Sequence, residues 1–320
     1  MLNEAEHVDS FLADIAAQDF RGETEVLVAD GGSTDGSVEK LELAAQRTKL
    51  DLTVLPNPAG WVSQGLNLCI QRASGDLVVR LDCHSRYPSD YLRLCASAAE
   101  ETDALAVGGV VVPHGRTPIE RAVACAMDSP FGGIGWMWVS DEVLRRESDT
   151  VTYGAFRPEA FRRAGMFDES LHRNQDDEMM LRIRRGGGRV ILDPAIKVHY
   201  TPRGSYRGVF RQYFQYGLWK VPVMLKHRQV LSARSLAPIA FVGSLAVLAP
   251  AAALTPVAGV VLVTELAAYA AGGLVFGARS LRAHGEPLRL LPYVLAVYPT
   301  FHLAYGLGML RGWLRAARRR

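Results

Sequence analysis

The most constraining feature of this chain is a long apolar stretch near its C-terminus. Between residues 236 and 278 the only charged side chain is Glu265. Thr255 and Pro256 divide the stretch into two runs, each about as long as a helix needs to cross a hydrocarbon core of about 30 Å. We therefore predict two transmembrane helices, at about 236–254 and 256–278, joined as a tight hairpin. Buried helices of a soluble core are the alternative, which two adjacent apolar runs of this length disfavour.

A third apolar segment lies at about 290–310, and Pro292 and Pro299 interrupt it. Five arginines follow it at the end of the chain. If this segment crossed the membrane, the arginines would lie on the side opposite to the other basic flanks, against the positive-inside tendency. We predict that the segment lies at the membrane interface or re-enters the membrane.

Acidic residues are concentrated before the apolar stretch, which predicts a division of the chain near residue 230. Residues 1–230 read as a soluble domain in the cytoplasm, and residues 231–320 as a region that holds it at the cell membrane as a multi-pass protein. The net charge of +3 is too small to favour nucleic acid. Basic clusters beside apolar segments favour an anionic membrane surface instead, so we expect a membrane partner and no nucleic acid.

Strand-like and helix-like segments alternate over the first hundred residues. The predicted strands lie at 26–29, 52–55, 76–81 and 104–112, and the predicted helices at 36–47, 62–73 and 89–100. Continuous apolar strands that alternate with helices are typical of an α/β, Rossmann-like fold with a mainly parallel sheet.

The first candidate ligand site is the loop that starts at Asp30. Asp30 ends a predicted strand, which is where open α/β sheets bind ligands. Its carboxylate can accept hydrogen bonds from a ribose or a base, and Gly32 lets the backbone approach a ligand closely. The alternative is a turn-forming Asp-Gly pair. The glycines do not follow the GxGxxG spacing, which counts against a dinucleotide fold.

The second candidate site is Asp82-Cys83-His84, at the end of the predicted strand 76–81. A carboxylate and an imidazole two residues apart on a sharp strand exit can hold one divalent cation. Mg²⁺ or Mn²⁺ at that place could neutralise a nucleotide diphosphate.

A third acidic group lies at 174–178 and heads a predicted helix. We interpret one of its carboxylates as a general base that deprotonates an acceptor hydroxyl. Solvated charges at a helix start are the alternative.

The order of these motifs resembles family 2 glycosyltransferases of the GT-A fold. The likeness spans about residues 1–220, and it is strongest to the branch that includes succinoglycan-biosynthesis glycosyltransferases, which shares the Arg-Leu-Asp-x-His and Asn-Gln-Asp-Asp-Glu spellings. The motifs that carry the resemblance are Asn3-Glu4, Val28–Gly36, Asn57-Pro58 with Gly65-Leu66-Asn67, Arg80–His84, Asp149–Ala155, Gly165–Glu169 and Asn174–Glu178.

The resemblance implies roles for individual residues. The nucleotide-sugar donor would be bound by Asn3, Glu4, Asp30, Gly32, Asp35, Asn67 and Arg80. The metal, Mg²⁺ or Mn²⁺, would be held by Asp82 and His84. His199 is either a further metal or phosphate contact or a core histidine.

The same resemblance implies that Asp176 is the catalytic base, with Asp177 and Glu178 supporting it. Gln175 stands where most of the family has Glu, which leaves no acidic group at that position.

The function implied is an inverting transfer of a sugar, with UDP-hexose as the expected donor, to a glycan or lipid-linked acceptor in polysaccharide biosynthesis. A polyprenyl-phosphate glycosyltransferase is the alternative within the class. A nucleotidyltransferase is disfavoured because no Gly-rich loop with Arg and Lys follows Asn3-Glu4. An inactive binding or assembly subunit is the remaining alternative.

Family members begin with an apolar strand that leads into the Asn-Glu loop, whereas Met1-Leu2 alone precede Asn3 here. We expect that strand to be encoded upstream of Met1.

The segment 205–228 mixes aromatic and basic residues. This pattern fits a helix at a membrane interface as well as a buried aromatic stripe.

Overall fold

The computed structural model describes residues 1–132, 144–230 and 233–318. It divides into two compact units. The first holds Met1–Val112 and Val139–Tyr200, and the second holds Pro113–Trp138 and Thr201–Arg320. This division places segment 205–228 with the C-terminal unit, whereas the sequence analysis ended the catalytic domain at residue 230.

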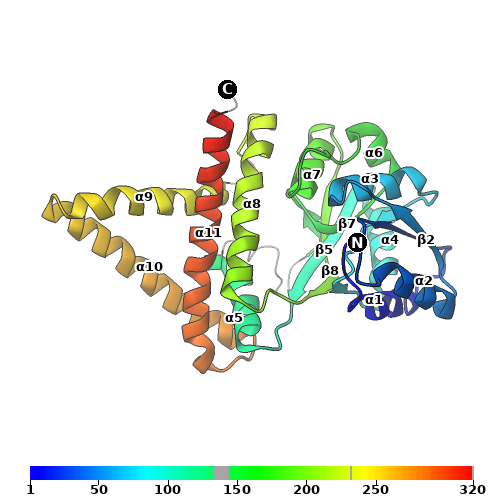
Figure 1. The fold of residues 1–320 in the computed structure, drawn as a ribbon, viewed down its shortest axis with the longest axis horizontal. Helices are drawn as coiled ribbons and strands as arrows, with labels where there is room; N and C mark the ends of the chain where they lie inside the picture. Colours follow the sequence, from blue (N-terminus) through cyan, green and yellow to red (C-terminus); the bar gives the residue numbers. More distant parts are fainter. Residues whose placement is uncertain (133–143, 231–232, 319–320) are drawn as a thin grey trace. The chain divides into compact units, whose positions relative to one another are not determined.

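The first unit is built from alternating helices and short strands (Figure 1). In chain order its elements are α1 (Val8–Ala16), β1 (Glu25–Asp30), α2 (Ser37–Thr48), β2 (Asp51–Pro56), α3 (Val62–Arg72), β3 (Val78–Val79), β4 (Ser85–Arg86), α4 (Tyr91–Thr102), β5 (Ala106–Pro113), β6 (Arg146–Glu147), β7 (Thr152–Phe156), α6 (Pro158–Ala164), α7 (Gln175–Arg185) and β8 (Val190–Tyr200).

The strands of this unit form two sheets. β1 and β2 pair in parallel from Glu25 and Asp51 to Asp30 and Pro56, so both leave the sheet at the same edge. The second sheet has the order β3-β7-β5-β8-β4, with β6 beside β8.

The predicted α/β class is confirmed, but the prediction of a mainly parallel sheet is not. The pairs β3–β7, β5–β7, β4–β8 and β6–β8 are antiparallel. The physical reason is that a short apolar run fits a strand of either direction, so periodicity does not reveal the direction of pairing.

A core of apolar side chains lies between the second sheet and helices α6 and α7. Phe156 of β7 packs against Phe161 and Phe167, with ring centroids 5.3 and 5.9 Å apart. Met179 and Met180 of α7 are fully buried in the same cluster. Burial of side chains of this size stabilises a fold by roughly 1.5–3 kcal/mol each. This packing fixes the position of α7, whose first turn carries the predicted base.

Gly109 explains an irregularity in β5. A Cβ atom at this position would lie 1.8 Å from the carbonyl oxygen of Ile196 in β8, so no other residue fits there without a shift of the backbone. The register of β5 against β7 also shifts between Val107 and Gly109. The bulge therefore follows from the close approach of β8.

The second unit is helical. Its elements are α5 (Pro118–Met127), the short 3₁₀ turn η1 (Pro130–Gly132), α8 (Tyr206–His227), η2 (Ala233–Leu236), α9 (Ala237–Ala252), α10 (Pro256–Ala283), η3 (Leu288–Leu290) and α11 (Leu291–Ala317). α8 and α11 lie side by side along most of their length (Figure 1).

Glycines bring α8 and α11 into close contact. A Cβ at Gly217 of α8 would lie 2.1 Å from the carbonyl oxygen of Tyr305, and a Cβ at Gly308 of α11 would lie 2.1 Å from that of Phe214. Tyr213 and Phe301 also stack with their ring centroids 3.9 Å apart. The aromatic residues of α8 therefore serve in part as a buried stripe.

Three helical segments of the second unit are long and apolar enough to cross a membrane: Ala233–Ala252, Pro256–Ala283 and Leu288–Ala317. They overlap all three segments that the sequence analysis singled out, although the first ends at Ala252 and the predicted span at residue 254. The most apolar part of the third is 39% buried within the chain, compared with 0% and 6% for the first two. The third helix thus differs from the others because it packs along α8.

Candidate functional site

The loop after β1 is closed by the side chain of Asp30. One carboxylate oxygen accepts hydrogen bonds from the backbone N–H groups of Gly32 and Ser33, at 2.9 and 3.0 Å. The other accepts one from the Ser33 hydroxyl at 2.6 Å. Burial raises the pKa of Asp30, but these hydrogen bonds outweigh it and hold the pKa below its usual value. Asp30 therefore remains ionised and shapes the loop directly.

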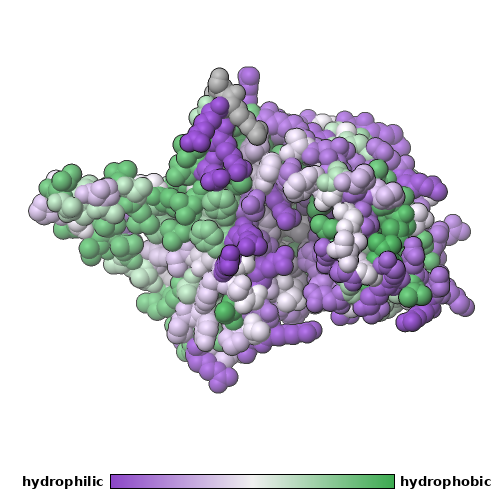
Figure 2. Space-filling view, viewed as in Figure 1, coloured by the Kyte–Doolittle hydropathy of each residue, from purple (hydrophilic) through white to green (hydrophobic). Residues whose placement is uncertain are grey.

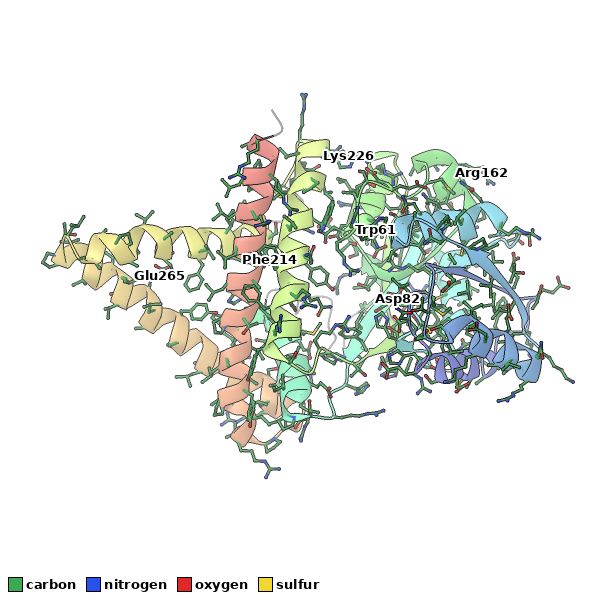
Figure 3. The ribbon with its side chains drawn as sticks, viewed as in Figure 1. Trp61, Asp82, Arg162, Phe214, Lys226 and Glu265 are labelled. Carbon is green, nitrogen blue, oxygen red and sulfur yellow. The ribbon has the colours of Figure 1, made fainter. Side chains whose placement is uncertain are left out.

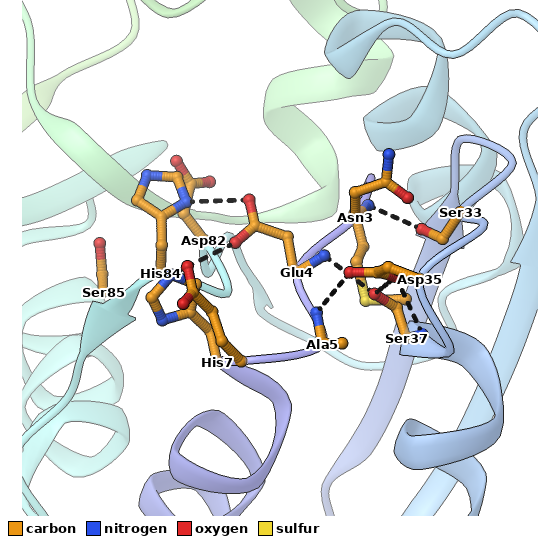
Figure 4. Close-up of polar contacts among 12 residues, drawn as sticks. Asn3, Glu4, Ala5, His7, Ser33, Asp35, Ser37, Asp82, His84 and Ser85 are labelled. Atoms are coloured by element: carbon orange, nitrogen blue, oxygen red, sulfur yellow. Dashed lines mark hydrogen bonds and ion pairs between the residues drawn. The ribbon is translucent and has the colours of Figure 1, made fainter. Parts of the chain in front are cut away.

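The Asn3-Glu4 segment is fastened to this same loop (Figure 4). The backbone N–H of Asn3 donates to Ser33 Oγ at 2.9 Å, and the Asn3 side chain accepts from the N–H of Thr34 at 2.9 Å. The N–H of Glu4 donates to Ser37 Oγ at 2.9 Å. The two predicted nucleotide-binding segments thus form one surface.

Asp35 stabilises this surface through hydrogen bonds to both segments. Its carboxylate accepts from the N–H groups of Ala5 and Ser37, at 3.0 and 3.1 Å, and from the Ser37 hydroxyl. The hydrogen bond from the Ser37 hydroxyl contributes most to holding its pKa below the usual value. Asp35 thus positions the loop, and its role in binding the donor stays a prediction.

Glu4 extends from this surface to the second candidate site. Its Oε1 lies 3.4 Å from Nδ1 of His84 (Figure 4). Burial raises the pKa of Glu4. The hydrogen bond and the charge of His84 lower it by more, so the net pKa is below the usual value. The contact joins the nucleotide-side loop to the Asp82-Cys83-His84 turn.

Two hydrogen bonds stabilise that turn. The backbone N–H of Asp82 donates to the hydroxyl oxygen of Tyr87 at 2.6 Å, and the N–H of Ser85 donates to the carbonyl oxygen of Asp82 at 3.1 Å. The strand before the turn is shorter than predicted: only Val78–Val79 pairs, with β7. The carboxylate of Asp82 remains about one quarter exposed.

Arg80 joins Asp82 to Asp176. Its Nε and Nη2 lie 3.2 Å from Oδ1 of Asp82, and its Nη1 donates to Oδ1 of Asp176. The Arg80 side chain is 10% exposed, and the Asp176 side chain is 28% exposed. A single cation therefore brings the acid of the predicted metal site next to the predicted base.

Burial and charge act in opposite directions on Asp176. Burial raises the pKa of the Asp176 carboxyl, and the Arg80 guanidinium lowers it by less, so the net pKa lies above the usual value. A carboxylate with a raised pKa is a stronger proton acceptor, which suits a general base.

Glu178 anchors the helix that carries Asp176. Its fully buried carboxylate pairs with Arg182 one turn later, with Arg182 Nε 3.0 and 2.9 Å from its two oxygens. Arg182 also donates to the carbonyl oxygens of Ala164 and Met166, the latter at 2.8 Å. Glu178 therefore supports the site through Arg182. Asp177 lies beside Asp176 and raises its pKa further.

Asn67 holds the segment that leads to α7. Its side-chain nitrogen donates to the Phe167 carbonyl and to Glu169, both at 2.9 Å, and its oxygen accepts from the N–H of Phe167 at 2.9 Å. The residue is 4% exposed. The resemblance assigned Asn67 to the donor, but its side chain is engaged within the chain, so the structure gives it a positioning role.

Comparison with known proteins identifies the family. Residues 1–167 match the family model described as "Glycosyl transferase family 2". The chain belongs to this family. It is 30% identical over 327 aligned residues to the succinoglycan biosynthesis protein ExoA of Rhizobium meliloti (strain 1021), a match that covers 99% of this chain and 94% of that protein. The resemblance predicted from the motifs is confirmed.

Solved structures of similar fold include a mannosyltransferase and the protein TarS. The mannosyltransferase PcManGT from Pyrobaculum calidifontis, in complex with GDP-Man and Mn²⁺, is 22% identical with a TM-score of 0.65, covering 97% of this chain and 85% of that one. Residues 1–349 of S. aureus TarS are 15% identical with a TM-score of 0.51, covering 99% and 90%. At these identities the likeness shows the fold, and the predicted GT-A fold is confirmed.

The side chains of Asp82 and His84 are of the chemical types that bind divalent metal ions. Carboxylate and imidazole are both ligands for first-row divalent ions, and two protein ligands leave positions for diphosphate oxygens. Among the residues that the structure describes, no three or more His, Cys, Asp or Glu side chains are grouped to hold a metal. A metal here would therefore need ligands from the bound donor.

His199 and Gln175 are the remaining residues from the sequence analysis. In β8, His199 pairs with Arg86, while the neighbouring Tyr200 places its ring 6.5 Å from that of His84. Gln175 is 4% exposed, and its side-chain oxygen has no hydrogen-bond partner among the residues that the structure describes. The sequence analysis did not single out Tyr87 and Arg182 for these supporting roles, because neither contact follows from local spacing.

Proposed function

We propose that this glycosyltransferase moves a hexosyl group from a nucleoside-diphosphate sugar, expected to be a UDP-sugar, to a hydroxyl of a glycan or lipid-linked acceptor. The observation that carries the proposal is the bridge through Arg80. Arg80 bonds the carboxylates of both Asp176 and Asp82, which supports a base for the acceptor and a metal-binding acid for the diphosphate within one site. The likeness to a succinoglycan biosynthesis protein supports polysaccharide synthesis as the setting.

The donor would be bound on the surface formed by the Asp30 loop and the Asn3-Glu4 segment. The hydrogen bonds that fasten these segments preorganise the surface, so little conformational freedom is lost when a nucleotide binds. The pKa of Asp30 lies below its usual value, so its carboxylate remains ionised, which favours hydrogen bonds from a ribose or base.

Asp82 and His84 would hold a divalent cation, Mg²⁺ or Mn²⁺. When bound, such an ion supplies positive charge that stabilises the departing diphosphate. The complex of a protein of the same fold with GDP-Man and Mn²⁺ supports this assignment. Arg80 adds a second positive charge on the same side of the site.

The transfer itself would be a single displacement with inversion. Asp176 accepts the proton of the acceptor hydroxyl as its oxygen forms a bond to the anomeric carbon. The bond from that carbon to the diphosphate oxygen breaks, and the nucleoside diphosphate leaves with the electron pair. Glu178 and Arg182 keep α7 in place, so Asp176 needs no rearrangement during the reaction.

The apolar helices of the second unit would hold the enzyme at the cell membrane, with the catalytic unit in the cytoplasm. Their length and composition support attachment to lipid. This location fits an acceptor that is itself lipid-linked.

A donor screen tests the proposal. The full chain, reconstituted in lipid, is incubated with a panel of UDP-, GDP- and dTDP-sugars and a lipid extract as acceptor. Release of nucleoside diphosphate that depends on the acceptor is the expected result. Binding of a nucleotide sugar with no release from any donor would favour the inactive-subunit alternative.

A further inference from the structure

Helices α9 and α10 form a hairpin with an exposed apolar surface. Both helices contact α11 at their outer ends and meet at Leu254 and Thr255 (Figure 1). The tip carries strongly exposed apolar side chains: Leu254 is 83% and Val257 is 73% exposed. Hydrophobic residues predominate over the hairpin surface (Figure 2). Such a surface requires lipid or another apolar environment.

The free part of each helix is short. A Cβ at Gly306 of α11 would lie 2.4 Å from the carbonyl oxygen of Pro238 and 2.7 Å from Val242, so α9 leaves α11 only after Val242. Residues 243–252 then extend by about 15 Å at the rise of an α-helix. The hydroxyl of Tyr269 in α10 lies 2.7 Å from Nδ1 of His302 in α11, and Gly273 and Gly277 also lie against α11. Residues 256–268 therefore extend freely by about 20 Å. Neither length spans a hydrocarbon core of about 30 Å.

The free parts of α9 and α10 both start at α11, so the place of α11 relative to the membrane decides how deep the hairpin reaches. α11 packs closely along α8 through Gly217 and Gly308. α8 carries Arg207, Arg211 and Lys220 along its length, and charged side chains of this kind are costly within hydrocarbon. The α8–α11 pair therefore belongs at the polar boundary of the membrane, and the hairpin projects from that boundary.

The tip also lacks the residues that anchor a loop at a far interface. From residue 242 to residue 264 the chain has no aromatic and no charged side chain. At the opposite end of the hairpin, Arg234 precedes α9, and Arg279 and Arg282 lie in the last turns of α10. Interfacial aromatic and basic residues normally flank a spanning segment on both sides, with the basic ones favouring the cytoplasm.

The polar groups of the hairpin are bonded within the chain. At the tip, the N–H groups of Leu254 and Thr255 both donate to the Ala251 carbonyl at 2.9 Å, and the Thr255 hydroxyl accepts from the N–H of Ala258 at 3.3 Å. Farther from the tip, the Ser244 hydroxyl donates to Glu265 at 2.6 Å, which joins the two helices. Figure 3 labels Glu265 on α10. Internal pairing of this kind is what a segment immersed in hydrocarbon requires.

We propose that α9 and α10 form a monotopic hairpin, which enters the membrane from the side of the α8–α11 pair and ends within the hydrocarbon without crossing it. The occupant of its exposed surface is the acyl chains of the bilayer. The proposal rests on the membrane attachment given above, and it replaces the two crossings expected from the sequence with one insertion from a single side. No part of the chain then reaches the opposite face of the membrane.

Cysteine labelling in sealed membrane vesicles tests the proposal. Leu254→Cys places a thiol at the tip, and Leu288→Cys is the matched control at an exposed apolar position, 49% exposed, between α10 and α11. Both full-length variants are treated with a membrane-impermeant maleimide in right-side-out and in inverted vesicles, and the parent chain gives the background from the native cysteines.

The expected result is that L288C is labelled from one side only, and that L254C is labelled from neither side until detergent is added. Labelling of L254C from the side opposite to L288C would overturn the proposal, because the tip would then cross. Labelling of both from the same side would also overturn it, since the hairpin would lie outside the lipid.

The failure of membrane attachment itself is distinguished by carbonate extraction. A chain that stays in the pellet but shows a labelled tip contradicts only the monotopic hairpin. A chain released into the supernatant contradicts the membrane attachment as well. Retained nucleoside diphosphate release in L254C shows that the variant is folded.

Discussion

Arg80 donates a hydrogen bond to Asp176, a residue 96 positions later in the chain, while the same guanidinium lies 3.2 Å from Asp82. The two carboxylates belong to different parts of the first unit, one after β3 and one in the first turn of α7. A shared buried cation couples their charges, because each carboxylate changes the electrostatic environment of the other. Arg80 therefore acts as a positioning residue for both, in addition to any contact with the donor.

The first prediction concerns Arg80→Gln and the pH dependence of turnover. Burial raises the pKa of Asp176 and Arg80 lowers it, so the loss of Arg80 raises that pKa further. A base must be ionised to act, and turnover is lost as the pH falls through this pKa. The acidic limb of the kcat profile should therefore shift to higher pH in R80Q.

Arg80→Lys is the matched control for this prediction, because it keeps the positive charge and loses the two-pronged geometry. It should shift the acidic limb less than R80Q and still lower the rate. An acidic limb that is unchanged in R80Q would show that Arg80 does not control the ionisation of the base.

The second prediction concerns the divalent cation. Chelation with EDTA should abolish transfer, and Mn²⁺ or Mg²⁺ should restore it. Asp82→Ala should weaken the binding of nucleoside diphosphate in the presence of Mn²⁺, measured by titration calorimetry, and have a smaller effect in EDTA. Full activity in EDTA would refute the metal site at Asp82 and His84.

The third prediction compares two Glu–Arg pairs with the same helical spacing. In α7 the Glu178 side chain is fully buried and that of Arg182 is 18% exposed, whereas Glu159 and Arg163 in α6 are about half exposed. Removal of one partner of a buried pair costs about 3–5 kcal/mol, and an exposed pair contributes about 0–1 kcal/mol.

Thermal unfolding of the full chain should therefore show a much lower Tm for Glu178→Ala than for Glu159→Ala, with both variants in the same detergent. Equal Tm values would mean that the Glu178–Arg182 pair does not hold α7 in place.

Sequence reasoning was most successful where local pattern decides the structure. The predicted strands at 26–29 and 52–55 are β1 and β2, and the predicted helix at 62–73 is α3. The motif order also placed Asp30 and Asp82 at strand exits. These features depend on apolar runs and turn residues that lie close together in the chain.

Contacts between distant segments could not be predicted in this way. The bridge from Asp82 through Arg80 to Asp176 depends on the packing of α7 against the sheet, and the burial of Asn67 depends on Phe167. Helix α5 was missed, although its capping box, in which Thr117 and Glu120 bond each other's backbone, was visible in the sequence. The direction of β7 and β8 had no local signal at all.

The central claim is that Asp176 is the base of a sugar transfer from a nucleotide-bound donor. Asp176→Asn keeps the shape of the side chain and removes its ability to accept a proton. Turnover should fall at least about 100-fold, the low end for the loss of a general base. Donor affinity should change little, because the base faces the acceptor.

The decisive measurement is nucleoside diphosphate release by D176N beside the parent chain and the surface variant Glu159→Gln, with donor affinity measured on the same samples. The account predicts a large loss of release in D176N alone, with all three proteins binding the donor equally well. Release by D176N at a rate near that of the parent would contradict the account.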